Sequence, residues 1–329
     1  MKPFRTEISI APTGYKINYS DKILLAGSCF TDNIGEVLSN YKFNCLINPN
    51  GILYNPESIA LMLENLINNS GYKAEEFIHH NELWLSLMHH GCFSSASKDE
   101  LIKNTSETFS EANSFLKQAK VLIITWGTAW IYKYKQSGKT VSNCHKLPPD
   151  LFARERLSID NIISSYQNIL TLLKILNPNI KIIFTISPVR HLKDGFEENQ
   201  LSKSILIHAA HDLVSNFENA DYFPSYEIMH DDLRDYRFYA DDMVHPNKLA
   251  TQYIWEKFSD AFFSKDTLSI IKKIEKVKKF VEHKPFRFES EAYQKSLYDT
   301  LEKIAEIQKA FPQINFSQEI DTLKERIRL

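Results

Sequence analysis

The chain has 329 residues and a formal net charge of −2, and its hydrophobic and charged fractions are those of an ordinary globular protein. This length suits one large domain with an appendage, and the near-neutral charge excludes a general attraction to nucleic acid or to an anionic membrane. The sequence contains no signal-peptide-like segment at its start, no apolar run long enough to cross a bilayer, and no CxxC pairing among its four cysteines. We therefore expect a cytoplasmic protein with free thiols that binds neither nucleic acid nor membrane.

Short apolar runs alternate with longer amphipathic stretches up to about residue 262. Strands are expected where the runs are nearly continuous, with the last one weaker: 22–27, 43–47, 120–126, 181–187 and 221–226. Helices are expected between and after them, at 31–40, 56–69, 104–118, 158–176, 198–217 and 247–262. This alternation predicts a mainly parallel five-stranded sheet in a three-layer α/β/α domain.

Two segments interrupt this alternation, and a third region follows it. Residues 71–103 contain FIHHNELWLSLMHHGCF, and residues 131–145 alternate around Ser-Gly-Lys, which is a hairpin signal. We expect both to be insertions after strands, at the sheet edge where open α/β proteins form their clefts. From about residue 265 the pattern is helical only. The sequence thus divides into a domain at 1–264 and a helical extension at 265–329, which packs on the domain or on a second copy.

The first expected strand ends in Gly27-Ser28-Cys29, where a helix should begin. A side chain there lies at the carboxyl edge of the sheet and at a helix N-terminus, whose free N–H groups and dipole favour negative charge. Ser28 is therefore either a helix cap or a nucleophile whose oxyanion the backbone stabilises. Cys29 is the other candidate nucleophile. We rank it below Ser28, because free cysteine often packs as a small hydrophobe.

The partners that a nucleophile needs occur far downstream, in YADDMVHPN. Asp242 and His245 form an Asp-x-x-His motif just before a helix, so the carboxylate can orient the imidazole and leave its other nitrogen for Ser28. Asp241 is an alternative partner for the histidine, and only the spacing favours Asp242. Together with the Gly-Ser turn, the motif favours a Ser28–His245–Asp242 triad over a capped helix start.

Several blocks, in this order, resemble the GSCFA-domain family, a branch of the SGNH (GDSL-like) hydrolase superfamily. They are GSCF (27–30), NPNGILYNP (48–56), TWGTAWIY (125–132), NCHKLP (143–148), SPVRHLKDGFEENQLSK (187–203), FPSYEI (223–228) and DYRFYADDMVHPN (235–247). The resemblance covers about residues 20–260 and leaves the helical extension outside. It implies a flavodoxin-like three-layer fold, with Ser28 as nucleophile, His245 as base and Asp242 as the residue that orients it.

The resemblance also implies an oxyanion hole formed by the backbone N–H groups of Ser28 and Gly51. The superfamily adds an asparagine after the third strand, but this sequence has Trp126-Gly127-Thr128-Ala129 there. Thr128 and Asn143 are the candidate replacements for that missing donor. One missing oxyanion donor can cost about a hundredfold or more in rate.

Residues in the same blocks are candidates for substrate binding. Arg190 and His191 follow the fourth strand, and an arginine there either clamps a carboxylate or phosphate of the substrate or pairs with nearby acids, namely Asp194, Glu197 and Glu198. The remaining candidates in these blocks are Asn55, His145, Asn199 and Gln200.

Two histidine pairs, His79–His80 and His89–His90, flank Trp84 and raise the question of a metal. Adjacent strand residues point to opposite faces, so each pair would offer one ligand only. We therefore expect a pocket-lining hairpin and no metal site.

The sequence as a whole predicts a serine hydrolase that cleaves an O-acyl ester through an acyl-enzyme and requires no cofactor. The superfamily resemblance suggests a small-molecule or glycan ester, such as an acetylated sugar, as the substrate. Three alternatives stay open. They are an acyltransferase that uses the same triad, a binding module without activity, and a scaffold that forms homo-oligomers through the C-terminal helices.

Overall fold

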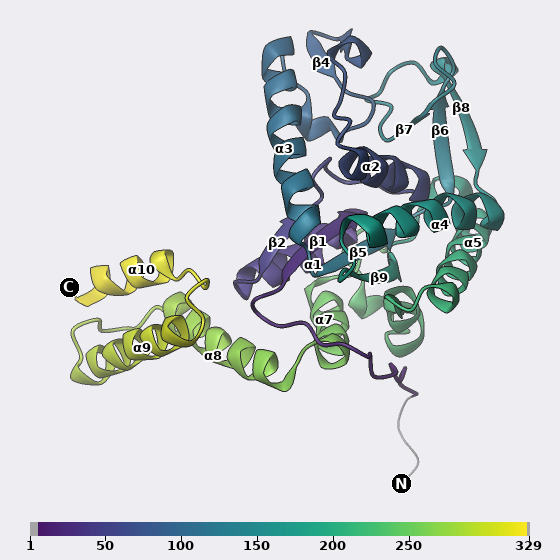
Figure 1. Cartoon of the computed structure of the whole chain (residues 1–329). Helices are drawn as coiled ribbons and strands as arrows, with labels where there is room; N and C mark the ends of the chain where they lie inside the picture. The colour runs from purple at the N-terminus through teal and green to yellow at the C-terminus, as the bar shows by residue number, and fades with distance from the viewer. Residues whose placement is uncertain (1–5, 328–329) are drawn as a thin grey trace.

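The computed structural model describes residues 6–327, so the first five residues of the expected domain and the last two of the extension lie outside it. Its centre is a parallel sheet with the strand order β2-β1-β5-β9-β10 (Figure 1). The strands are β1 (Lys22–Gly27), β2 (Asn44–Ile47), β5 (Val121–Trp126), β9 (Lys181–Ile186) and β10 (Ala220–Phe223). This is the flavodoxin-like order, and it confirms the expected five-stranded sheet.

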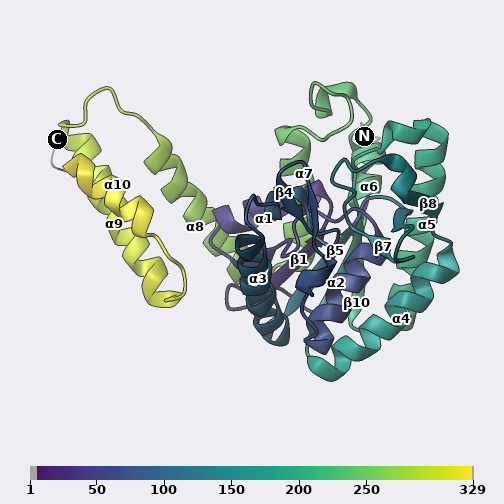
Figure 2. The ribbon, with the colours of Figure 1, turned by 90° about the horizontal axis from the view of Figure 1, so that it is seen from above.

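Helices cover both faces of the sheet and make the three layers seen in Figures 1 and 2. One face packs on α1 (Cys29–Asn40) and α7 (Lys248–Phe262). The other packs on α2 (Pro56–Asn68), α3 (Lys98–Gln118), α4 (Ile159–Leu176) and α5 (Gly195–Asn216). Successive strand residues serve opposite faces, since Leu25 joins the α1 and α7 core whereas Leu24 joins the other. Burial on both faces explains the continuous apolar runs of the strands.

The first insertion departs from the expectation. Its antiparallel strands, β3 (Ile78–His80) and β4 (Leu83–Leu85), lie between α2 and α3, so the insertion follows a helix rather than a strand. It still reaches the carboxyl edge of the sheet, because the His90 N–H donates to the Asn50 carbonyl (2.8 Å) in the loop after β2.

The second insertion does follow a strand, β5, and it is larger than the hairpin we expected. It is a three-stranded antiparallel sheet of β6 (Trp130–Tyr134), β7 (Thr140–Val141) and β8 (Phe152–Arg156). The charged sequence FARER of β8 lacks the apolar pattern that would have marked it as a strand. The two insertions are joined where the Ser142 and Asn143 N–H groups donate to the Leu87 carbonyl (2.8 and 3.1 Å).

Short helical turns complete the domain at loop ends. They are η1 (Ala74–Glu76), η2 (Gly91–Phe93), η3 (Pro149–Leu151), η4 (Leu192–Asp194), α6 (Ser225–Glu227), the π-helical turn η5 (Ile228–Asp232) and η6 (Tyr236–Phe238). None of the helices within residues 6–327 combines the length and the apolar composition needed to cross a membrane.

The extension consists of α8 (Lys265–Glu282), α9 (Glu291–Ala310) and α10 (Ser317–Ile327) and projects from the β2 side of the domain (Figures 1 and 2). Its apolar side chains belong to the same core as α1 and α7. The Tyr19 ring stacks on Phe43 and contacts Phe311 of the extension, at centroid distances of 4.3 and 5.7 Å. Lys42 Nζ lies 2.6 Å from Glu319 Oε1. The extension therefore packs on its own domain.

Candidate active site

The turn after β1 requires glycine. Gly27 has a φ of +153°, and a Cβ atom there would lie 2.2 Å from the Thr125 carbonyl oxygen of the neighbouring strand. The side chain of Asn48 fixes this turn from the loop after β2, because its Oδ1 accepts from the Gly27 N–H (2.7 Å). The start of α1 is thus held against the ends of two adjacent strands.

Ser28 makes neither of the contacts that its two suggested roles would require. It occupies the N-cap position of α1, but its side chain makes no capping hydrogen bond. The residue is fully buried, and its Oγ has no hydrogen-bond partner within residues 6–327. Its backbone is extended (φ −70°, ψ 177°), and its Cβ lies beside Gly127, where an added Cβ atom would be 3.4 Å away. The structure does not bring this hydroxyl to His245.

Cys29 takes the place that we had assigned to Ser28. It is the first residue of α1, and its Sγ lies 3.6 Å from Nε2 of His245, within hydrogen-bond distance for sulfur. The other ring nitrogen of His245, Nδ1, lies 2.6 Å from Oδ2 of Asp242. A thiol, an imidazole and a carboxylate therefore form one chain of contacts, as an activated nucleophile requires.

The loop before α7 holds this histidine and its acid in place. Asp242 Oδ1 accepts the backbone N–H groups of Val244 and His245, both at 2.9 Å, while Oδ2 faces the imidazole. These backbone hydrogen bonds, with the imidazole, lower the pKa of the Asp242 carboxyl to about 2, so it is ionised at neutral pH. The Ala240 N–H donates to the His245 carbonyl (2.8 Å) and closes the loop. Asp242, and not Asp241, is thus the partner of the histidine.

The Cys29 thiol lies in a mixed environment. Burial raises its pKa, the N–H groups of Phe30 and Cys29 at the start of α1 and the Lys203 ammonium lower it, and Asp32 raises it. Burial is the largest of these effects, so the thiol is protonated at neutral pH. It therefore needs a base to become a nucleophile, and His245 Nε2 is the base within reach.

The backbone donors expected for the oxyanion hole are already engaged. The Ser28 N–H donates to the Thr125 carbonyl (3.3 Å), and the Gly51 N–H donates to the Asn48 carbonyl (2.7 Å). The Cys29 N–H, by contrast, donates to no carbonyl of the described chain, because it precedes the first helical hydrogen bond. Of the three N–H groups, that of Cys29 is therefore the one left available for a ligand.

The two side chains expected there make other contacts in the structure. The Thr128 hydroxyl lies 3.2 Å from Ser202 Oγ, in the loop after β5. Asn143 Oδ1 accepts from the His145 N–H (2.8 Å), which folds its own loop. The contact of Thr128 involves its hydroxyl, whereas that of Asn143 involves only the amide oxygen and not its N–H donors.

Three of the substrate-binding candidates serve the fold. Asn55 caps α2, with Oδ1 accepting from the Ser58 N–H (2.8 Å). His145 Nε2 lies 2.8 Å from the Ser86 carbonyl and joins the two insertions. Gln200 Oε1 accepts from the Tyr226 hydroxyl (2.8 Å).

Arg190, in the segment after β9, contacts a histidine rather than the acidic residues near it in sequence. Arg190 Nε donates to Nε2 of His230 (2.8 Å), whereas Asp194 and Glu198 pair with Arg154 and Arg156 instead. The alternative that Arg190 pairs with this acidic stretch is thus not what the structure contains.

His191, the next residue, has a buried Nε2 with no hydrogen-bond partner in the described chain. Burial, assisted by the charges of Lys203 and His245, lowers its pKa to about 3. Its backbone N–H donates to Asn199 Oδ1 (2.9 Å), which fixes the segment on α5.

Lys203 is a functional candidate that the sequence did not reveal. It is fully buried, and its Nζ donates to the carbonyls of Gly127 and Ser187 (2.7 Å each), at the ends of β5 and β9. Ser202 beside it accepts the Ala129 N–H (2.8 Å). Burial lowers the pKa of Lys203 to about 7. Lysines are usually exposed, and nothing in the surrounding sequence marks this one as buried.

The histidine pairs do not converge on a site. His89 is buried, its Nδ1 lies 2.7 Å from Ser86 Oγ, and burial lowers its pKa to about 3. His79 instead packs on the Trp84 ring (5.0 Å between centroids). Throughout the part of the chain that the structure describes, no group of three or more His, Cys, Asp or Glu residues could hold a metal ion.

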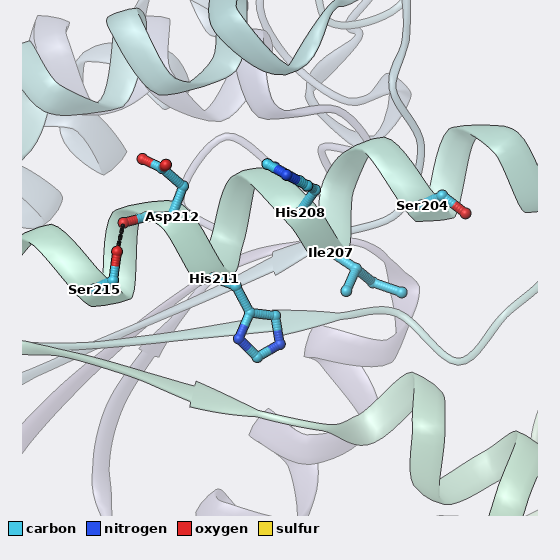
Figure 3. A pocket seen from close by; sticks show the side chains of 6 residues that line it. All are labelled: Ser204, Ile207, His208, His211, Asp212 and Ser215. Carbon is cyan, nitrogen blue, oxygen red and sulfur yellow. Dashed lines mark hydrogen bonds between the residues drawn. The ribbon is translucent and has the colours of Figure 1, made fainter.

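An open hollow on α5 lies apart from this arrangement (Figure 3). It is lined by Ser204, Ile207, His208, His211, Asp212 and Ser215, and shares no residue with the Cys29–His245 site. Ser215 Oγ turns back to the Asp212 carbonyl (2.7 Å), and the His211 ring packs near Tyr222.

Comparison with known proteins gives a clear family and weak structural likenesses. No curated protein matches the sequence. Among solved structures, a Clostridium thermocellum family 3 carbohydrate esterase shares 9% identity at a TM-score of 0.35, over 77% of this chain and 97% of the esterase. An acetyl xylan esterase from the rumen bacterium Butyrivibrio proteoclasticus shares 16% identity at a TM-score of 0.34, over 74% of this chain and 64% of the esterase.

Two family models match in succession. The model of the GSCFA family matches residues 22–258, and the model of the C-terminal domain of GSCFA domain proteins matches residues 274–329. The first spans most of the chain and includes Cys29, Lys203 and His245. This protein therefore belongs to the GSCFA family.

Proposed function

We propose that this protein is an acyl-transfer enzyme that cleaves an O-acyl ester with Cys29 as nucleophile, His245 as general base and Asp242 as the residue that orients the histidine. The observation that carries the proposal is the 3.6 Å contact between Cys29 Sγ and His245 Nε2, with Asp242 at 2.6 Å on the other side of the ring. Ser28, which the family resemblance suggested as nucleophile, makes no such contact.

The first half-reaction forms a thioester. His245 Nε2 takes the proton of the Cys29 thiol while the sulfur attacks the carbonyl carbon, and the π electrons of the carbonyl move to its oxygen. The resulting oxyanion lies next to the start of α1, where the Cys29 N–H and the helix dipole stabilise it. When the oxyanion collapses, the bond to the alkoxy oxygen breaks, and His245 gives its proton to the leaving alcohol.

The second half-reaction regenerates the enzyme. A water molecule loses a proton to His245 and attacks the thioester carbon. The C–S bond then breaks, the carboxylic acid leaves, and the Cys29 sulfur recovers its proton from the imidazolium. A second alcohol in place of water would make the same site an acyltransferase. An acyl group on a carbohydrate is our first candidate substrate, and this choice depends on the superfamily resemblance alone.

The test is acetylation by p-nitrophenyl acetate, followed by intact mass and peptide mapping. We expect an acetyl group on Cys29 that neutral hydroxylamine removes, as it does from thioesters. The adduct should be lost in Cys29→Ala and strongly reduced in His245→Ala. It should persist in Ser28→Ala and in the control Cys92→Ala, which removes an exposed thiol.

Two other outcomes would count against the proposal. An adduct on Ser28, lost only in Ser28→Ala, would restore the serine as nucleophile. If folded wild-type protein neither forms an adduct nor releases p-nitrophenol faster than buffer does, the chain is a binding module rather than an enzyme. Adding an alcohol acceptor distinguishes hydrolase from transferase, because only a transferase places the acetyl group on that alcohol.

A further inference from the structure

The proposed reaction leaves one electrostatic need unmet. An acyl-transfer site usually offers at least two donors to the oxyanion, and here the Cys29 N–H is the backbone donor without a carbonyl acceptor. The superfamily asparagine after the third strand is missing here, and the hydroxyl of the nearby candidate Thr128 contacts Ser202. A second donor must therefore come from another element.

His191 is a polar group in the correct neighbourhood with no other task. Its Nε2 is buried and has no hydrogen-bond partner among residues 6–327. A Cβ atom on Gly127 would lie 3.0 Å from this Nε2 and 3.4 Å from Ser28 Cβ, so the ring faces the segment that carries the nucleophile. The Gly127 position is thus kept free of a side chain at the point where the imidazole approaches.

The surroundings fix the orientation of the ring. The Tyr54 ring meets it edge-on at 5.5 Å between centroids, and the Asn199 side chain holds its backbone N–H at 2.9 Å. Tyr54 is tied to the same place, since its carbonyl accepts the N–H groups of Gly127 (2.8 Å) and Thr128 (2.9 Å). A donor that is held in this way needs little rearrangement when negative charge develops.

Its protonation state suits donation rather than proton transfer. Burial and the nearby charges of Lys203 and His245 keep the pKa of His191 at about 3, so the imidazole is neutral at physiological pH. A neutral imidazole carries one N–H, and placing it on Nε2 gives that buried atom its missing hydrogen bond.

We propose that the Nε2–H group of His191 donates a hydrogen bond to the oxyanion formed at Cys29, and so replaces the asparagine of related hydrolases. The inference rests on the proposed function. His191 touches the reacting oxygen but gains and loses no proton, so the balance of the reaction is unchanged.

The test compares two reactions of the same thiol. Acetylation by p-nitrophenyl acetate passes through an oxyanion, whereas alkylation by iodoacetamide is a direct displacement at carbon and forms none. In His191→Ala we expect the acetylation rate of Cys29 to fall by about a hundredfold or more, and its alkylation rate to stay within about twofold. His191→Gln, whose amide retains a donor, should recover part of the loss, and the control His208→Ala on the α5 surface should leave both rates unchanged.

The outcomes separate the proposals. If both rates fall together in His191→Ala, the residue supports the nucleophile or the fold and the inference is wrong. If neither rate falls, His191 has no part in the reaction. If wild-type Cys29 is alkylated but neither becomes acetylated nor releases p-nitrophenol, the proposed function itself fails. We also expect the ratio of wild-type to His191→Gln acetylation rates to be constant between pH 5 and 8, because a group that stays neutral adds no titration there.

Discussion

Two opposing influences act on the Cys29 thiol. Burial raises its pKa, while the N–H groups at the start of α1 and the Lys203 ammonium lower it. Since burial dominates, Cys29 differs from cysteines that exist as thiolates at neutral pH, and His245 must take the proton during the reaction rather than before it.

This environment predicts the pH dependence of Cys29 modification. Alkylation by iodoacetamide should increase about tenfold per pH unit from pH 6 to pH 8, because the thiolate fraction rises throughout this range. Peptide mapping separates Cys29 from the exposed Cys92 in the same sample. A rate that is constant below pH 7 would instead indicate a thiolate–imidazolium pair, and would contradict the base mechanism.

At the residue scale, the sequence did not predict whether Ser28 or Cys29 contacts the histidine. The Gly-Ser-Cys turn and the Asp-x-x-His motif predicted that these two segments meet, and the structure brings Cys29 and His245 into contact. They did not decide between adjacent side chains, because the direction of each depends on how β1 turns into α1. Cys29 and His245 are 216 positions apart, and no local pattern encodes their contact.

At the scale of elements, α5 holds the loops that surround the site. In its first turns, Asn199 accepts the His191 N–H and Ser202 accepts the Ala129 N–H. Lys203, on the same turns, donates to the carbonyls of Gly127 and Ser187. One helix thus positions the ends of β5 and β9 relative to each other. The sequence predicted this helix but not its role, since buried polar contacts have no periodicity.

Replacing Lys203 tests this role. In Lys203→Met the two carbonyls lose their donor inside the protein, so we expect the free energy of unfolding to fall by about 2–4 kcal/mol. The neighbouring exposed Ser204→Ala should change it by less than about 0.5 kcal/mol. Urea denaturation measures both. Equal stability of the two variants would mean that Lys203 is not a structural clamp.

The regular elements themselves were largely predictable. The strands of the central sheet are buried on both faces, and their apolar runs matched the observed strands to within a few residues. The structure of the two insertions was not predictable in this way, because β8 is charged and the 71–103 segment owes its position to contacts with the loop after β2. Tertiary contacts, rather than local propensity, shape these parts.

At the scale of the whole molecule, the helical extension and the domain share one core. Phe316, in the loop before α10, is fully buried in the cluster that also contains Phe43 and Trp255. Phe316→Ala should therefore destabilise the whole chain by about 3–5 kcal/mol, in a single unfolding transition. Phe286→Ala, at a fully exposed position, is the matched control and should change little. Separate transitions for domain and extension would show that they fold independently.

Three histidines, of which His89 is fully and His191 and His230 are partly buried, make the whole fold sensitive to acid. Burial lowers the pKa of His89 and His191 to about 3 and that of His230 to about 4, whereas an unfolded chain protonates histidine near 6.5. Below pH 6.5 the unfolded state therefore binds protons that the folded state does not. The stability due to each histidine is complete above pH 6.5 and is lost as the pH falls towards the folded pKa.

Between pH 7.5 and pH 5, each of these histidines should lower the free energy of unfolding by about 2 kcal/mol, which is a large part of the stability of a typical protein. Glu57 and Glu227 act in the opposite direction, because burial raises their pKa. Comparing wild type with His89→Gln removes this offset. Between pH 7.5 and pH 5 the free energy of unfolding of wild type should fall by about 2 kcal/mol more than that of the variant. If the difference stays constant over this range, His89 is protonated in the folded protein, and its burial does not exclude the charge.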